Sequence, residues 1–110
     1  MIYITIFQNQ GEICEFNCIG HAEYAEAGHD IVCAGVSALV INAINSIESL
    51  TGTTFDLVTD PECRSGLIDV TFTSELSSEA RLLLDSMILG LQGIQNDYGK
   101  DFLKLDFKEV

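Results

Sequence analysis

The stretch from Asp30 to Leu50 constrains the fold most, because it is apolar around more than one side of a helix. Asp30 can cap the start of this helix, and Thr51-Gly52 is a typical helix end. The apolar positions, which spread well beyond an ordinary core-facing stripe, are Val32, Val36, Leu39, Val40, Ile41, Ala43, Ile44, Ile47 and Leu50. One sheet cannot cover so much surface. We therefore expect the helix to pack on a sheet and also on a second helix or a second subunit.

Alternating apolar and polar residues before and after this helix predict strands. Strands over about 1–8 and 12–19 are joined by a turn at Asn9-Gln10-Gly11, and strands over 54–60 and 67–73 form a second hairpin. A second helix ends near Tyr98, its cap is one of Ser74, Ser77 and Ser78, and its core positions are Ala80, Leu84, Met87, Leu91 and Ile94. A last strand covers 102–107. The order ββαββαβ predicts an α+β fold in one domain, residues 1–110, with a mostly antiparallel sheet packed against two helices.

The charge of the chain restricts its partners. Seventeen acidic residues against five basic ones give a net charge of −12, which argues against direct nucleic acid binding because phosphate contacts need Lys and Arg. Such a charge attracts a basic partner, although it also serves solubility alone.

Nothing in the sequence predicts export or membrane insertion. The N-terminal segment lacks a basic region and alternates like a strand, so we do not expect a signal peptide. Polar residues interrupt the longest apolar run at Asp30, Asn42, Asn45 and Glu48, so we expect no membrane span and a cytoplasmic protein.

The four cysteines are expected to be reduced, because no export signal accompanies them. Cys14, Phe16 and Cys18 share one strand face by a period of two and are expected to be small core residues. Cys63 lies in a turn. A metal site built from His21, His29, Cys33 and one more cysteine is a weaker alternative, since no C-x-x-C or H-x-x-x-H spacing supports it. We therefore expect neither a metal nor a cofactor.

A candidate active site is formed by Cys33, in the first turn of the apolar helix, and by His21, at the end of the second strand. A helix N-terminus presents unpaired N–H groups and a partial positive charge, which favour a thiolate. A nearby imidazole can take the thiol proton and return it to a leaving group. Asp30 can orient that imidazole, as the third member of a triad does, while it also caps the helix.

Each of these residues also has a structural interpretation. Cys33 can be a core residue, since free cysteine is among the most buried residue types, and a lone histidine is often a surface residue. His29 competes with His21 as the base, but the end of a strand is a stiffer mount than a loop. Gly35 inside the helix costs about 1 kcal/mol of helix propensity, so a neighbouring chain or a substrate needs its space.

The segments Gly20-His21-Ala22 and Asp30-Ile31-Val32-Cys33-Ala34-Gly35-Val36-Ser37-Ala38-Leu39 resemble those of the ribosomal-processing cysteine protease Prp family, as do the length and element order of the whole chain. The resemblance implies a small homodimeric cysteine endopeptidase with Cys33 as nucleophile and His21 as base. Such enzymes remove a short N-terminal extension from a large-subunit ribosomal protein. The resemblance also implies that the loop between His21 and Cys33 orders over the peptide. We expect substrate contacts at Gly20 and Gly28, which bound that loop, and at Ser37.

A second class of function remains open. The chain can instead be a non-catalytic acidic module that holds a basic ribosomal or assembly protein, with Cys33 in the core. Fast alkylation of one cysteine at neutral pH favours the enzyme over this module.

Overall fold

The chain forms five strands and two helices in the predicted order: β1 (Ile2–Asn9), β2 (Glu12–Ile19), α1 (His29–Thr51), β3 (Phe55–Thr59), β4 (Ile68–Phe72), α2 (Ser78–Tyr98) and β5 (Leu103–Glu109). The computed structural model describes residues 1–20, 29–60, 66–99 and 101–110, and for residues 29 and 30 only the backbone. The element order and the α+β class expected from the sequence are confirmed.

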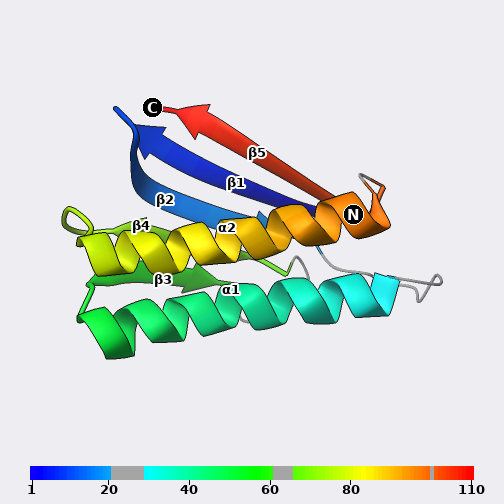
Figure 1. The fold of residues 1–110 in the computed structure, drawn as a ribbon, viewed down its shortest axis with the longest axis horizontal. Helices are drawn as coiled ribbons and strands as arrows, with labels where there is room; N and C mark the ends of the chain where they lie inside the picture. Colours follow the sequence, from blue (N-terminus) through cyan, green and yellow to red (C-terminus); the bar gives the residue numbers. More distant parts are fainter. Residues whose placement is uncertain (21–28, 61–65, 100) are drawn as a thin grey trace.

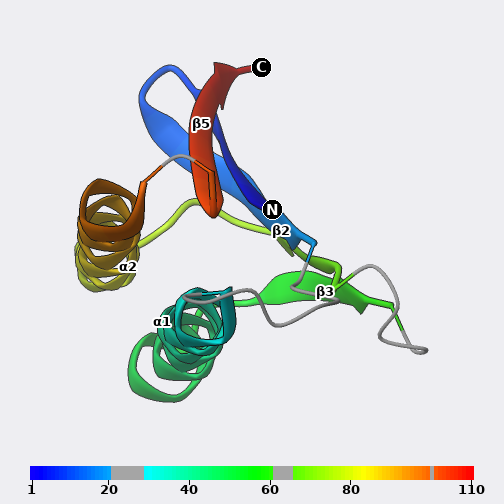
Figure 2. The same ribbon diagram turned by 90° about the vertical axis from the view of Figure 1, so that its right-hand side faces the viewer.

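The strands form one sheet in the order β3-β4-β2-β1-β5, and both helices cover the same face of it (Figures 1 and 2). Three of the four neighbouring pairs are antiparallel, and β1 and β5 are parallel. The parallel pair follows from α2, which carries the chain back along the sheet before β5 begins. The expectation of a mostly antiparallel sheet packed against two helices is therefore confirmed.

The first hairpin turns at Gln10 and Gly11, which both have positive φ (52° and 82°), as a tight two-residue turn requires. A register shift follows between Phe7 and Gln8. This β-bulge makes Cys14 the extra residue of β2, and its sulfur donates to the Phe7 carbonyl at 3.4 Å. The prediction that Cys14 shares a core face with Phe16 and Cys18 is therefore wrong, because the bulge breaks the alternation.

Helix α1 uses most of its apolar surface inside the chain. Val40 and Ile44, which seemed to exceed what a sheet can cover, are 0% and 8% exposed, whereas Ile41 remains 49% exposed. Both side chains are therefore covered within the chain, so the width of the apolar face does not by itself require a second subunit. The helix ends as predicted, at Thr51, with Gly52 at a φ of 66°.

By length and composition alone, residues Ile31–Thr51 would suffice to cross a membrane, contrary to our expectation from the interrupting polar residues. A core helix passes the same test. Here the apolar residues pack into the core with the strands and α2, the buried ones being Val32, Val36, Val40, Ala43, Ile44 and Ile47.

Helix α2 begins after Ser77, whose side chain accepts a hydrogen bond from the Ala80 N–H at 3.1 Å. It runs beside α1 at close range (Figure 1). A methyl group on Gly35 would lie 3.2 Å from Ile94 Cδ1, and one on Gly90 would lie 2.8 Å from Leu39 Cδ1. The space at Gly35 is therefore used by a neighbouring helix, one of the two alternatives that its helix propensity raised.

Candidate active site

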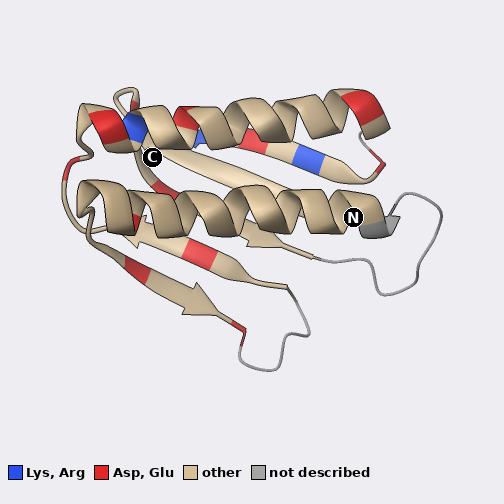
Figure 3. Ribbon diagram, turned by 60° about the horizontal axis from the view of Figure 1, so that its bottom comes forward, with Lys and Arg blue, Asp and Glu red and all other residues tan. Residues whose placement is uncertain are grey.

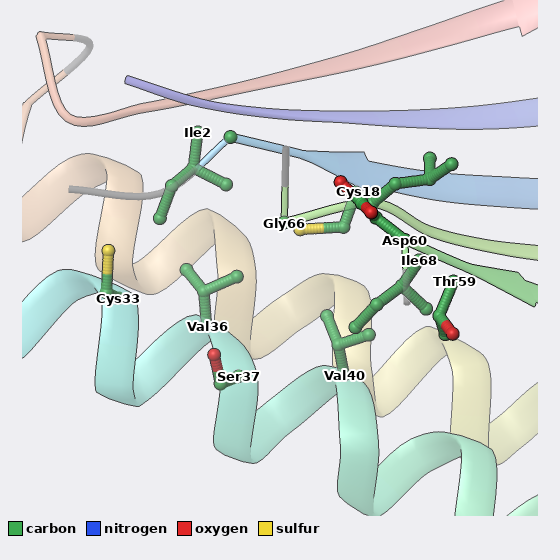
Figure 4. Close-up of a pocket in the computed structure, with 12 residues that line it drawn as sticks. Ile2, Cys18, Cys33, Val36, Ser37, Val40, Thr59, Asp60, Gly66 and Ile68 are labelled. Carbon is green, nitrogen blue, oxygen red and sulfur yellow. The ribbon is translucent and has the colours of Figure 1, made fainter. Parts of the chain in front are cut away.

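A cavity of about 380 Å³ opens between the first half of α1 and the ends of the strands (Figure 4). Its walls come from α1, from the ends of β2 and β3, and from the starts of β1 and β4. The lining residues are Ile2, Cys18, Gly20, Cys33, Val36, Ser37, Val40, Thr59, Asp60, Gly66, Leu67 and Ile68. The cavity is thus mainly apolar, with hydroxyl, carboxyl and thiol groups at particular positions on its wall.

Cys33 is the fifth residue of α1 and is half-buried. Its side chain extends from the helix toward the strands, as do those of Val36 and Val40 (Figure 4). Val36 and Val40 are buried and hold this face of the helix against the core. The sulfur is therefore carried by a packed helix and faces the cavity, a position in which a nucleophile can meet a bound molecule.

Cys18 lines the same cavity from β2. Its burial, reinforced by the nearby Cys33 thiol, raises the pKa of Cys18 to about 11. Cys18 is therefore a protonated thiol at neutral pH. The prediction that it is a buried residue is confirmed at 6% exposure.

Gly20 follows β2 directly, lines the cavity and has a φ of 102°. A side chain there would overlap the carbonyl oxygen of Met1. The position therefore excludes other residues for two reasons: its backbone conformation, and the approach of the neighbouring chain. Its tight packing fixes the backbone directly after β2.

The structure brings three predicted site residues to one cavity: Gly20, Cys33 and Ser37. Ser37 is exposed and lies one turn after Cys33 (Figure 4). His21, Gly28, Cys63 and the loop expected to order over a peptide lie outside the described residues, as do the side chains of His29 and Asp30. The backbone of Asp30 is described, and α1 begins one residue before it, so Asp30 lies in the first turn and not ahead of the helix.

Sequence reasoning missed the part of the cavity that comes from the strands. Thr59, Asp60 and Ile68 reach the site because β3 and β4 pair side by side and end next to α1. These residues carry no motif of their own.

Among the residues that the structure describes, no group of three His, Cys, Asp or Glu side chains could hold a metal ion.

The sequence model of one protein family, described as cysteine protease Prp, matches residues 1–103. The chain is 34% identical over 109 residues to the ribosomal processing cysteine protease Prp of Staphylococcus aureus, covering 98% of this chain and 100% of that protein. It is 39% identical over 110 residues to the protein of the same name from Bacillus subtilis, covering 96% of each.

Two crystal structures of the essential ribosomal processing protease Prp from Staphylococcus aureus have the same fold. One contains a substrate peptide and matches with a TM-score of 0.88 at 33% identity, over 98% of this chain and 100% of that one. The other contains a covalently linked product peptide and matches with a TM-score of 0.86 at 34% identity, with the same coverage.

Proposed function

Because the chain belongs to the cysteine protease Prp family, we propose that it is the endopeptidase that removes a short N-terminal extension from a large-subunit ribosomal protein. Its relatives are named as ribosomal processing proteases, and one binds a substrate peptide in a crystal. The net charge of −12 suits a basic protein substrate and not a nucleic acid. The proposal covers residues 1–110 as one cysteine protease domain acting in the cytoplasm.

In the proposed reaction Cys33 is the nucleophile and His21 the general base. His21 takes the thiol proton, the sulfur attacks the peptide carbonyl carbon, and a tetrahedral oxyanion forms. In this proposal, backbone N–H groups at the start of α1 stabilise that oxyanion, since the first N–H groups of a helix have no partner within it. The imidazolium then gives its proton to the leaving amine, which leaves a thioester on Cys33.

Hydrolysis of the thioester completes the cycle. His21 takes a proton from water, the hydroxide attacks the thioester carbonyl, and the Cys33 thiol is regenerated as the acid product leaves. Asp30 is assigned to orient the imidazole, and Gly20, Gly28 and Ser37 to contact the peptide. One observation supports this assignment most: the Cys33 side chain faces a mainly apolar cavity from a packed helix (Figure 4).

We assign the protein to a homodimer whose contact is the outer surface of the two helices. The middle of both helices carries few charges (Figure 3), which is unusual for so acidic a chain. Ile31, Leu82 and Leu89 are 61%, 68% and 70% exposed. Two copies with a net charge of −12 repel each other least where neither carries charge. Light scattering at micromolar concentration should report a dimer, and Leu89→Glu should shift it toward the monomer.

The test of the proposed activity uses the precursor ribosomal protein with its N-terminal extension. Intact-mass analysis should show loss of the extension with the wild-type chain and no detectable loss with Cys33→Ala. Cys14→Ala is the matched control, because Cys14 lies in the bulge of β2 and outside the cavity. Cleavage by Cys33→Ala would exclude this cysteine as the nucleophile. Binding of the precursor without cleavage by the wild-type chain would favour the non-catalytic module.

A further inference from the structure

β3 lies at one margin of the sheet, and among the described residues no strand pairs with its outer edge, which we call the free edge (Figure 2). The Asp60 N–H donates to the Leu67 carbonyl, and the Thr73 N–H donates to the Thr54 carbonyl. Since backbone direction alternates along a strand, the even-numbered residues of β3 point their N–H and C=O groups at β4. Those of Phe55, Leu57 and Thr59 therefore point away from the sheet.

The two margins of the sheet differ in how they are protected. At the other margin, β5, the Leu105 N–H donates to the Gln95 side chain at 3.2 Å, and exposed Lys104 and Lys108 flank it. Such bonds and charges prevent another strand from adding. On β3 the register with β4 has no shift, and no Lys, Arg or Pro lies within the strand. Within the described ranges, no backbone bond is found from the outward groups of Leu57 and Thr59.

The free edge leads into the cavity that holds Cys33. Thr59, the last residue of β3, lines that cavity together with Cys33 and Ser37. On α1, Gly35 and Leu39 face α2, so Cys33, Ser37 and Ile41, at intervals of four residues, form the opposite flank. Ile41 and Leu57 are each 49% exposed, one on this flank and one on β3. A margin with exposed apolar residues Leu57 and Ile41 and polar residues Thr59 and Ser37 therefore leads from β3 to the Cys33 thiol.

We propose that the substrate peptide binds in an extended form as a sixth strand on the free edge of β3, and that it reaches Cys33 along the Ser37 flank of α1. This inference rests on the proposed function and adds how the peptide is recognised. Backbone bonds to the edge would supply affinity that does not depend on sequence, while the cavity selects one side chain.

The length of the cavity indicates how far from the cleaved bond the peptide residues that pair with β3 lie. Val40 and Cys33 both line it and are seven residues apart on α1, which corresponds to about 10 Å along the helix. An extended peptide covers that distance in about three residues. The residues paired with β3 therefore lie roughly three or more positions from the bond that is cleaved.

Because successive side chains of an extended peptide point to opposite faces, the pairing also predicts the face on which each peptide side chain lies. Leu57 and Thr59 pair with Val70 and Ile68, so they share the sheet face that the helices cover. A peptide side chain on that face would enter the cavity or cover Ile41, and its two neighbours would point to the open face of the sheet. Only every second side chain of the peptide should therefore contribute to substrate selection.

The test scans the peptide backbone on the wild-type protein. The probe is a 14-residue peptide spanning the processing site of the ribosomal protein precursor, methylated at one amide nitrogen at a time. We expect kcat/KM to fall about tenfold or more at alternate positions beyond the third residue from the cleaved bond, and less than about twofold between them. Equal tolerance at all these positions would overturn the edge-strand inference.

A second measurement changes the enzyme instead of the peptide. Leu57→Pro removes an outward N–H without removing a bond to β4, and Leu57→Val keeps that N–H. We expect the proline variant to raise KM about tenfold or more with the valine variant within about threefold, while both keep the wild-type circular dichroism spectrum and Cys33 alkylation rate. Unchanged KM in a folded proline variant would overturn the inference. If the wild-type chain cleaves no unmodified peptide, the proposed function fails instead.

Discussion

The two flanks of α1 have opposite surroundings although they belong to one apolar helix. On one flank, Gly35 and Leu39 lie in close contact with Ile94 and Gly90 of α2. On the other, Cys33 and Ser37 line a cavity. The closed flank packs against α2, and the open flank presents its side chains to the cavity.

Residues that stabilise the packing of the two helices and residues proposed to act in the reaction therefore lie within about two turns of the same helix. A change on the closed flank should alter the free energy of unfolding and leave the reaction intact. A change at Ser37 or Ile41 on the open flank should do the reverse, because these two side chains are exposed. Glycine is what makes the closed flank possible, since a methyl group at Gly90 already approaches Leu39 within 2.8 Å.

The largest expected effect concerns His21, the proposed general base. His21→Ala should lower kcat about 100-fold to 10,000-fold, the range that a general base contributes, without changing the free energy of unfolding by more than about 1 kcal/mol. His29→Ala is the matched control and should retain most of the activity. The measurement is peptide cleavage against pH. A larger loss from His29→Ala than from His21→Ala would reverse the assignment of the base.

On the closed flank, Leu39→Ala should lower the free energy of unfolding by about 2 kcal/mol, because it empties a half-buried site against α2. Ile41→Ala, on the open flank, should cost less than about 1 kcal/mol, since half of that side chain is already exposed. Urea unfolding measures both. The kcat/KM of folded Leu39→Ala should stay within about twofold of the wild type, and a large loss would show that the two flanks are coupled.

The cavity beside the open flank should also respond to alkaline pH through Cys18. Its pKa is raised from 9.0 to about 11, mainly by burial, so the folded chain holds this proton more tightly than the unfolded chain does. Unfolding therefore releases a proton between pH 9 and 11, and this contribution to stability is present below pH 9 and is lost as the pH rises through 11.

The test compares wild type with Cys18→Ala. The stability of the wild type relative to this variant should decline by on the order of 2 kcal/mol from pH 8 to pH 11. Mass mapping after iodoacetamide treatment at pH 8 should find Cys33 modified well before Cys18. A constant stability difference, or early modification of Cys18, would contradict the burial of its thiol as the cause.

The smallest expected effect comes from two glycines of α2. A methyl group at Gly93 meets nothing within 4 Å in the described chain, so Gly93→Ala should stabilise the protein by up to about 1 kcal/mol through helix propensity. At Gly90 the same gain is offset by the contact with Leu39, so Gly90→Ala should be neutral or destabilising. Thermal unfolding of the pair measures the difference, and equal stabilisation would show that Leu39 moves aside at no cost.

Local patterns in the sequence were sufficient for the elements of the fold. The alternation of apolar and polar residues predicted both ends of β2, and Ser77 was among the capping residues expected for α2. The predictions were wrong where the arrangement of a segment depends on the element that packs beside it. The bulge at Cys14 depends on the pairing of β1 with β2, and the burial of Val40 and Ile44 depends on the elements packed around α1. Neither partner is visible in the pattern of one segment.

The residues of the candidate site also fall into those that the sequence could indicate and those that it could not. Cys33 could be singled out because its place near a helix start gives a thiol a recognisable chemical environment within a few residues of sequence. Thr59, Asp60 and Ile68 could not, because they reach the cavity only through the order β3-β4-β2 and the packing of α1 beside those strand ends.

The sequence by itself determined the elements, their order, the family and the choice of Cys33 as the candidate nucleophile, because these depend on residue type and on spacings of a few residues. Only the tertiary structure decided which flank of α1 is closed, which sheet margin is unprotected, and that the two meet at one cavity. The physical reason is that burial and free hydrogen-bonding groups belong to pairs of elements. Whether a Leu39 is covered or a Leu57 N–H is left free depends on which element lies beside it.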